Sequence, residues 1–167
     1  MSQIDDVRAA VAKDPGRMTM QLARELGVPE AEIVRALPDG RAVELDSARW
    51  EELVRSFEGL GELHVIVSNG GATLEAVGRF GEFSTWGEFF NVQTESLDMH
   101  IRWPELGAVF AVDKPSHMNG VSTLSVQFFD KAGHAAFKVF FNFGGKPSPE
   151  RAAKFAELRQ AFRRRTE

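Results

Sequence analysis

The feature that most constrains the fold is a run of short segments, rich in Val, Phe and Ile, that begins after Gly61. Turn residues separate these segments, which are LHVIVS, TLEAVGRF, GEFFNVQ, SLDMHIRW, GAVFAVD, STLSVQFF and HAAFKVFF. Such short, turn-bounded segments predict strands that pair in an antiparallel sheet. Residues 1–60 show helical spacing instead, and Ser148 opens a further helix. The sequence therefore predicts an α+β fold that forms one compact unit: a small N-terminal helical cap over 1–60, then a large antiparallel β-sheet with a C-terminal helix over 61–167.

The composition excludes several classes of site. The chain has no cysteine, which excludes disulfides, thiolate zinc sites, iron–sulfur clusters and cysteine nucleophiles together. It has 14 phenylalanines and no tyrosine, so its aromatic surface suits burial or an apolar ligand better than polar recognition. No apolar run approaches the roughly 18 residues that cross a bilayer, and the start MSQIDDVRAAVAKD does not resemble a signal peptide. We expect a cytoplasmic location and no membrane insertion.

Residues 18–37 have the spacing of a helix-turn-helix, with Gly27 at the turn. The second helix, over residues 29–37, carries Glu30 and Glu32 and only one arginine, so it would bring negative charge towards phosphate. The net charge of -4 gives no reason to expect nucleic acid either. We interpret this segment as a helical cap that does not bind DNA.

The segment QFFDKAGHAAFKVFF predicts a hairpin that turns at Gly133. With Phe129 opposite His134, alternation along the strands sorts the side chains onto two faces. One face is entirely apolar and is predicted to be core: Leu124, Val126, Phe128, Ala135, Phe137, Val139 and Phe141. The other face mixes aromatic and polar groups: Thr123, Ser125, Gln127, Phe129, His134, Ala136, Lys138 and Phe140. Either a ligand covers this second face, or the C-terminal helix or a dimer partner does.

The segment SLDMHIRW divides in the same way. Its apolar residues Leu97, Met99, Ile101 and Trp103 fall on one side, and Asp98, His100 and Arg102 fall on the other. A haem site needs a neutral imidazole for the iron, apolar walls for the porphyrin and cations for the propionates. On the residues alone, a strand histidine is more often an ordinary surface residue than an iron ligand.

Four stretches, VPEAEIVRALP, GEFFNV, DMHIR and SVQFFDKAGHAAFKVFF, carry a resemblance that extends over nearly the whole chain. In them the sequence resembles the ChuX/HutX-type cytosolic haem-utilisation proteins. The resemblance implies a fold similar to one half of the HemS/ChuS haem-trafficking proteins, and a homodimer with extended antiparallel sheets. It also implies haem as cargo, bound in the cytosol and passed to a haem-degrading enzyme or another acceptor.

The family pattern contains two histidines, and only the second is matched here, by His100. The first falls at Ser68, with His64 four residues earlier on the same predicted strand face. Ser84 and Trp86 also stand where relatives often have histidines. The resemblance therefore implies His100 as the sole protein ligand of the haem iron, with His64 as the alternative if the strand shifts.

Several other residues are candidate haem contacts. Lys138 is expected either to bind a propionate or to form a structural ion pair, and Arg102 is the second candidate cation. Trp86 is expected either to stack beside the porphyrin or to fill core, and core is the more common role for such a residue. Phe140 and Gln127 share the predicted mixed face with Lys138. His117 and Met118 lie in the loop KPSHMNG, where an exposed, unligated side chain is the favoured interpretation.

Enzymatic chemistry has little support in the sequence, which lacks a nucleophile elbow, a histidine–carboxylate metal motif and a phosphate-binding glycine loop. We therefore expect a haem-binding protein for storage or transfer, not an enzyme. A haem-degrading enzyme is one alternative, because a single histidine leaves an open coordination position on iron. A dimeric binding or regulatory protein that has lost haem ligation is another, suggested by Ser68.

Overall fold

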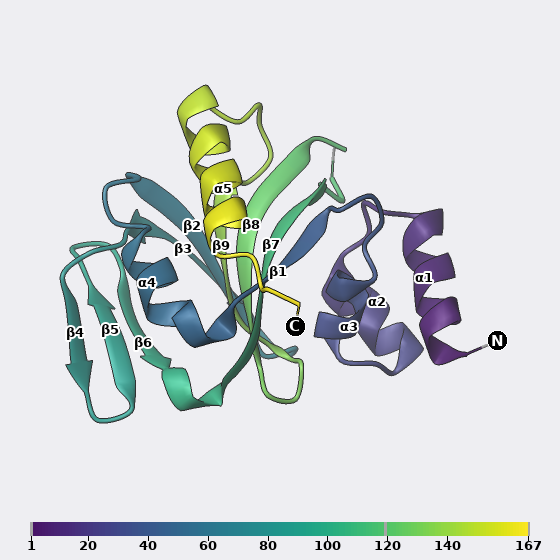
Figure 1. Ribbon diagram of the computed structural model, residues 1–167, viewed down its shortest axis with the longest axis horizontal. Coiled ribbons are helices and arrows are strands. Elements are labelled where there is room, and N and C mark those ends of the chain that lie inside the picture. The colour runs from purple at the N-terminus through teal and green to yellow at the C-terminus, as the bar shows by residue number, and fades with distance from the viewer. Residues whose placement is uncertain (1, 119, 167) are drawn as a thin grey trace.

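The computed structural model describes residues 2–118 and 120–166, and within them it confirms the predicted α+β architecture (Figure 1). The helices are α1 (Gln3–Lys13), α2 (Thr19–Leu26), α3 (Glu30–Arg35), α4 (Trp50–Arg55) and α5 (Pro149–Ala161). The strands are β1 (Ala42–Leu45), β2 (Glu62–Ser68), β3 (Thr73–Arg79), β4 (Phe83–Trp86), β5 (Phe89–Gln93), β6 (Asp98–Arg102), β7 (Leu106–Pro115), β8 (Ser122–Asp130) and β9 (Ala135–Asn142). Two short 3-10 turns, Ser47–Arg49 and Trp103–Glu105, precede α4 and β7.

The strands form two sheets instead of one. A six-stranded sheet has the order β1-β7-β8-β9-β2-β3, and a three-stranded sheet has the order β4-β5-β6, with every described pair antiparallel. The chain leaves the large sheet after β3, where Glu82 adopts a left-handed backbone conformation with φ of 50°. Residues that have the same alternating pattern in the sequence are thereby divided between two surfaces.

The large sheet has a hydrophobic core on each face. On one face its strands pack with α4, α5 and the small sheet, through residues such as Phe57, Phe90 and Phe128. On the other face α1, α2 and α3 cover only the end near β7 and β8, where they enclose Phe110 and Phe129. Figure 1 shows these three helices gathered beside β1, at the end of the molecule opposite β4, β5 and β6. Among the described residues, this second core reaches the start of β9 at Ala135 and includes none of β2 or β3.

The range 1–60, predicted as a helical cap, contains strand β1 as well. β1 pairs with β7, and Leu45 also bridges to Arg163 after the C-terminal helix. The backbone N–H of Asp46 donates to the carbonyl of Phe162 at 2.8 Å. β1 therefore holds the N-terminal segment and the C-terminal end of the chain together at one edge of the large sheet.

The hairpin of β8 and β9 has a different register from the one predicted. Phe128 lies opposite Phe137 and Gln127 opposite Lys138, whereas the pairing of Phe129 with His134 was wrong. At Gln127 and Phe128 the partner is displaced by two residues from the predicted one, and a bulge between Phe128 and Phe129 accounts for one of the two. Because side chains alternate with a period of two, this shift leaves both faces as predicted for most positions. The exceptions are Ala135 and Ala136 beside the bulge, which exchange faces.

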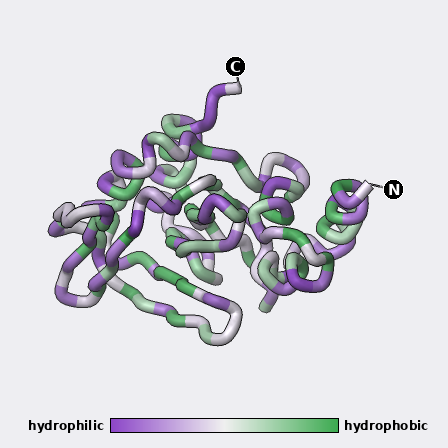
Figure 2. Tube along the Cα trace, turned by 90° about the horizontal axis from the view of Figure 1, so that it is seen from below, coloured by the Kyte–Doolittle hydropathy of each residue, from purple (hydrophilic) through white to green (hydrophobic). Residues whose placement is uncertain are grey.

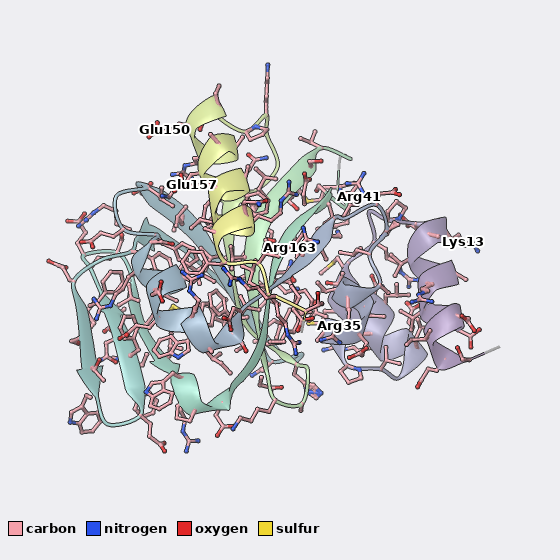
Figure 3. All side chains as sticks on the ribbon, in the orientation of Figure 1. Lys13, Arg35, Arg41, Glu150, Glu157 and Arg163 are labelled. Atoms are coloured by element: carbon pink, nitrogen blue, oxygen red, sulfur yellow. The ribbon has the colours of Figure 1, made fainter. Side chains whose placement is uncertain are left out.

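Charged side chains lie on the surface of α5 and beyond its C-terminal end. Hydrophobic and hydrophilic residues interchange at short intervals along the chain trace (Figure 2). On α5 the exposed side chains of Glu150 and Glu157 project from the helix, and Arg163 follows its C-terminal end (Figure 3). None of the helices in the described part of the chain is long and apolar enough to span a membrane.

Candidate functional site

The uncovered part of the large sheet forms the floor of a cavity of about 440 Å³. Its walls come from β2, β3, β8 and β9, from the start of α2, and from the loop that follows β7. The residues that line it are Met18, Thr19, Met20, Glu30, Ile66, Ser68, Thr73, Glu75, Lys114, Ser116, His117, Met118, Thr123, Gln127, Ala135, Ala136, Phe137, Lys138, Phe140 and Phe143. A volume of this size is within the range of small-molecule and cofactor sites.

Strand register explains why polar and apolar groups meet on this floor. Across neighbouring strands, Gln127 lies opposite Lys138, Lys138 opposite Ile66, and Ile66 opposite Glu75. Side chains at paired positions share a face of the sheet. The sequence predicted that Gln127, Lys138 and Phe140 share a face, and the structure confirms this and places all three on the cavity.

Lys138 forms an ion pair with Glu30, which the sequence had left as one of two roles for this lysine. Both side chains are largely buried, and the Thr19 hydroxyl donates to the Glu30 carboxylate at 2.6 Å. This contact joins β9 to the helical cap at the inner end of the cavity. Because Glu30 already neutralises it, Lys138 adds little free positive charge to the cavity.

Lys114, at the end of β7, was not among the residues singled out in the sequence. Its ammonium group donates to the backbone carbonyls of Pro115 at 3.0 Å and Gly16 at 3.4 Å, and these are its only hydrogen bonds to described residues. Burial, reinforced by the positive charge of Lys138, lowers the pKa of Lys114 from 10.5 to about 8. The cavity therefore contains a desolvated cation whose described hydrogen-bond partners are all neutral. The sequence carried little signal for it, because a lysine before a proline at a strand end is common on surfaces.

Gln127 has an unsatisfied amide on the same floor. Its side chain is only 3% exposed, and its Nε2 donates to Ser125 Oγ at 3.1 Å. Its Oε1 is buried and has no hydrogen-bond partner among the described residues. A buried acceptor left unpaired costs roughly 1–3 kcal/mol, so this position is suited to a bound group. The Ser125 hydroxyl can donate or accept, which lets the Gln127 amide turn over and offer either its oxygen or its N–H group to a ligand.

The remaining walls are apolar and adaptable. Phe140 and Phe143 meet edge to face at 5.0 Å between ring centroids. Met18, Met20 and Met118 stand around the cavity, and their unbranched thioethers can adjust to the shape of a flat ligand. His117, beside Met118 in the loop, is exposed and borders the cavity.

His64, the alternative iron ligand, is engaged by its neighbours at the edge of this cavity. Its Nε2 lies 3.0 Å from Glu75 Oε1. Its ring stacks on Phe143 with 3.9 Å between centroids. An iron ligand at this position would have to give up the contact with Glu75.

His100, Arg102 and Trp86 lie elsewhere, on the outer face of the small sheet, and none of them lines the cavity. The His100 side chain is 52% exposed, and Trp86 is 77% exposed, so the core-filling role of Trp86 was wrong. Arg102 is held by Glu88, with Nε 3.1 Å from its carboxylate. The predicted iron ligand and the predicted cation Lys138 therefore occupy different surfaces of one chain.

The small sheet fixes the orientation of the His100 ring. Its Nδ1 lies 2.7 Å from the side-chain oxygen of Asn91, an acceptor, so the hydrogen is on Nδ1. Asn91 is buried, and its amide N–H group donates to Ser84 Oγ at 3.2 Å. Nε2 is on the exposed side of the ring, 3.3 Å from Asp98 Oδ1, and iron binding there would break this contact, as it would break the contact of His64 with Glu75. Metal-binding histidines commonly have such a hydrogen bond at the other ring nitrogen, and the sequence gave no sign of the role of Asn91.

The described residues contain no group of three or more histidine, aspartate or glutamate side chains that could hold a bare metal ion. What the chain offers is a set of separate parts: an apolar cavity with a buried cation, and an oriented imidazole on a neighbouring sheet. These parts fit a large ligand that carries its own metal better than a free ion.

Comparison with known proteins agrees with this geometry. The family model for haem utilisation ChuX/HutX matches residues 43–158. The intracellular heme transport protein HutX of Vibrio cholerae is 23% identical over 158 residues, which cover 92% of this chain and 81% of HutX. Protein AGR_C_4470 from Agrobacterium tumefaciens has a solved structure that is 31% identical, covers 98% of both chains and has a TM-score of 0.82.

The heme degrading enzyme ChuS of Escherichia coli O157:H7 shows the same fold at 22% identity, with a TM-score of 0.79. The similarity covers 98% of this chain and 48% of ChuS, which confirms the predicted likeness to half of such a protein. Together with the family match over more than half of the sequence, these results confirm the resemblance seen in the motifs. The chain belongs to the ChuX/HutX family of haem-utilisation proteins.

Proposed function

We propose that this protein binds haem as cargo and passes it to an acceptor inside the cell. The observation that carries the proposal is the cavity on the large sheet, where apolar walls stand around the half-buried cation Lys114. A porphyrin with propionate groups is complementary to this combination. The name of the relative HutX, an intracellular heme transport protein, supports the same role.

Different residues of the site contact different parts of the haem. Phe140, Phe143 and the methionines contact the macrocycle, and Lys114 donates to a propionate oxygen in a charge-assisted hydrogen bond. Gln127 turns its amide towards the same carboxylate. His100 is the iron ligand, with its tautomer set by Asn91 and its Nε2 turned outwards.

A homodimer completes this site. Because His100 and the cavity lie on different surfaces of one chain, a second protomer is the source of an imidazole for the iron. The outer face of the small sheet, with exposed Trp86 and His100, covers the mouth of the partner's cavity in this arrangement. The exposed tryptophan is typical of a surface that a protein partner buries.

The test of haem binding is a titration of the purified protein with hemin, followed in the Soret region. We expect saturation at about one haem per chain and clearly weaker binding in His100→Ala. His134→Ala is the matched control, because His134 is exposed in the β8–β9 turn and lies outside the cavity. No saturable binding by the wild-type protein would reject the proposed function. An unchanged spectrum in His100→Ala would reject His100 as the ligand.

The composite dimer has a sharper test. In the proposed dimer each site takes Lys114 from one protomer and His100 from its partner. A homodimer of either variant, His100→Ala or Lys114→Met, therefore has two damaged sites and is expected to bind haem weakly. A mixture that forms heterodimers contains one intact site and one site with both changes. We expect tight binding to return at about one haem per heterodimer. If mixing restores nothing, while light scattering shows that heterodimers form, both residues act within one chain and the composite site is wrong.

Transfer, not degradation, is the role that we propose for the bound haem. HutX corresponds to this chain over most of its length, whereas the chain matches about half of the enzyme ChuS. The test is to incubate haem-loaded protein with ascorbate and oxygen in the presence of catalase. A stable Soret band, with transfer of haem to apomyoglobin, is expected. Rapid loss of the Soret band with release of iron would favour the haem-degrading alternative.

A further inference from the structure

We infer that the cavity recognises the carboxylate-bearing porphyrin independently of its iron, so that metal-free protoporphyrin IX binds at the same site. This inference rests on the proposed function and specifies which part of the ligand the chain recognises. It follows from which groups line the cavity and which lie outside it.

The imidazoles are placed unfavourably for binding iron from within the cavity. Of the described residues that line it, only His117 carries an imidazole, and that side chain is exposed in the loop after β7. His64 is held against Glu75 and Phe143, and His100 is on the other sheet. The described lining of the cavity therefore contains no strand-borne imidazole.

The two lysines that line the cavity differ in their partners. Lys138 pairs with Glu30, and Glu75 contacts His64, so these groups are engaged with each other. Lys114 remains, with hydrogen bonds to two backbone carbonyls and no described carboxylate within ion-pair distance. A carboxylate that reaches Lys114 gains a charge-assisted hydrogen bond in a largely desolvated place, where such bonds are stronger than in water.

Gln127 supplies a second and independent indication. This residue lines the cavity and is almost fully buried, and its Oε1 has no hydrogen-bond partner among the described residues. With the amide turned over, Ser125 donates to its oxygen, and its N–H group becomes the unpaired polar group beside the cavity. Lys114 and Gln127 together provide donors of the kind that a propionate needs, and neither of them requires a metal.

The macrocycle adds binding that is the same with or without iron. Burial of apolar surface contributes roughly 25 cal/mol per Å², and the aromatic and methionine walls contact the porphyrin ring in both cases. Coordination by His100 is then an additional contribution that only the iron-containing ligand receives. We expect the dissociation constant of protoporphyrin IX to lie within about 10-fold of that of hemin.

The experiment is a fluorescence titration of the full chain with protoporphyrin IX, in parallel with the hemin titration. The dimethyl ester of protoporphyrin IX, which has the same ring and no carboxylate, is the control for unspecific apolar binding. We expect saturable binding of the diacid and at least 10-fold weaker binding of the diester. Equal binding of the diester would overturn the inference.

Variants of Lys114 and His100 are expected to affect the two ligands differently. Lys114→Met is expected to weaken both protoporphyrin IX and hemin by about 10-fold or more. His100→Ala is expected to weaken hemin and leave protoporphyrin IX unchanged within 3-fold. Gln127→Leu, which keeps the size of the side chain and removes its amide, is expected to weaken both ligands. Unchanged affinity for protoporphyrin IX in Lys114→Met would overturn the inference.

The outcomes also separate the inference from the proposed function. If hemin binds tightly and protoporphyrin IX binds more than 100-fold more weakly, iron is required for recognition and the inference is wrong, while the proposed function stands. If neither ligand saturates the protein, the proposed function is wrong as well.

Discussion

Replacing Lys114 by methionine is predicted to make the ligand-free protein more stable at pH 7 while it weakens binding. The structure buries this ammonium group among neutral carbonyls near Lys138, which lowers its pKa from 10.5 to about 8. A pKa displaced this far means that the charged lysine lowers the free energy of unfolding at neutral pH by about 3.4 kcal/mol. Solvent at the cavity mouth screens part of that cost, and methionine loses two hydrogen bonds, so we expect a net gain of about 1–2 kcal/mol.

The sign of the pH dependence follows from the same displacement. The unfolded chain keeps the proton of this lysine up to about pH 10.5, whereas the folded chain loses it near pH 8. Between these values the unfolded state binds more protons, so the stability of the wild-type protein rises with pH. Below pH 8 the full cost is present. The advantage of Lys114→Met is therefore expected at pH 7 and is expected to shrink by pH 10.

Urea denaturation of the wild type and Lys114→Met at pH 7 and pH 10 measures this effect. The chain has no cysteine and no tyrosine, so few groups other than lysines titrate in this window. Lys131→Met is the matched control, because Lys131 is exposed in the β8–β9 turn and its replacement is expected to change stability by less than about 0.5 kcal/mol. A Lys114→Met protein that is less stable than the wild type at pH 7, or a difference independent of pH, would refute the reasoning.

The remaining predictions concern the fold and the dimer. Glu30→Gln is expected to destabilise the protein by about 2–3 kcal/mol, because it leaves Lys138 buried and unpaired; a double variant with Lys138→Met should recover part of this loss in urea denaturation. Gly133→Ala is expected to cost about 1–3 kcal/mol in thermal denaturation, because φ is +86° and a Cβ would lie 2.7 Å from Pro29 Cβ. Trp86→Lys is expected to shift the homodimer proposed above towards monomers in sedimentation experiments without loss of stability, since Trp86 is exposed in the single chain; an unchanged sedimentation profile would contradict an interface at Trp86.

Local patterns were sufficient for the class of fold. The strand segments and their alternation were predicted from the sequence, and the side assignments of Val126, Phe128 and Val139 are confirmed as core. The division of SLDMHIRW is confirmed for Leu97 and Ile101, which are buried, and for His100, which is exposed, but it was wrong for Trp103, which is 40% exposed in a 3-10 turn. Alternation with a period of two is a local property, so it survives even where the predicted pairing was wrong by two residues.

The arrangement of the site was not available from such patterns. His100 and Lys138 have the same alternating context in the sequence, yet one belongs to the small sheet and the other to the large sheet. Trp86 fits core by composition, but β4 is the edge strand of the small sheet and leaves it exposed. Lys114 has a common surface sequence around it, and only a tertiary contact, with the carbonyl of Gly16 before α2, shows that it is partly buried.

The sequence by itself determined the α+β class, the segments that form strands, the faces of those strands and the family, because these depend on residue type and spacing along the chain. Only the tertiary structure decided which strands share a sheet, that Lys138 is neutralised by Glu30, that Lys114 is half-buried against backbone carbonyls, and that Gln127 is buried with an unpaired oxygen. Burial and charge pairing depend on residues far apart in the chain, and no local pattern records them.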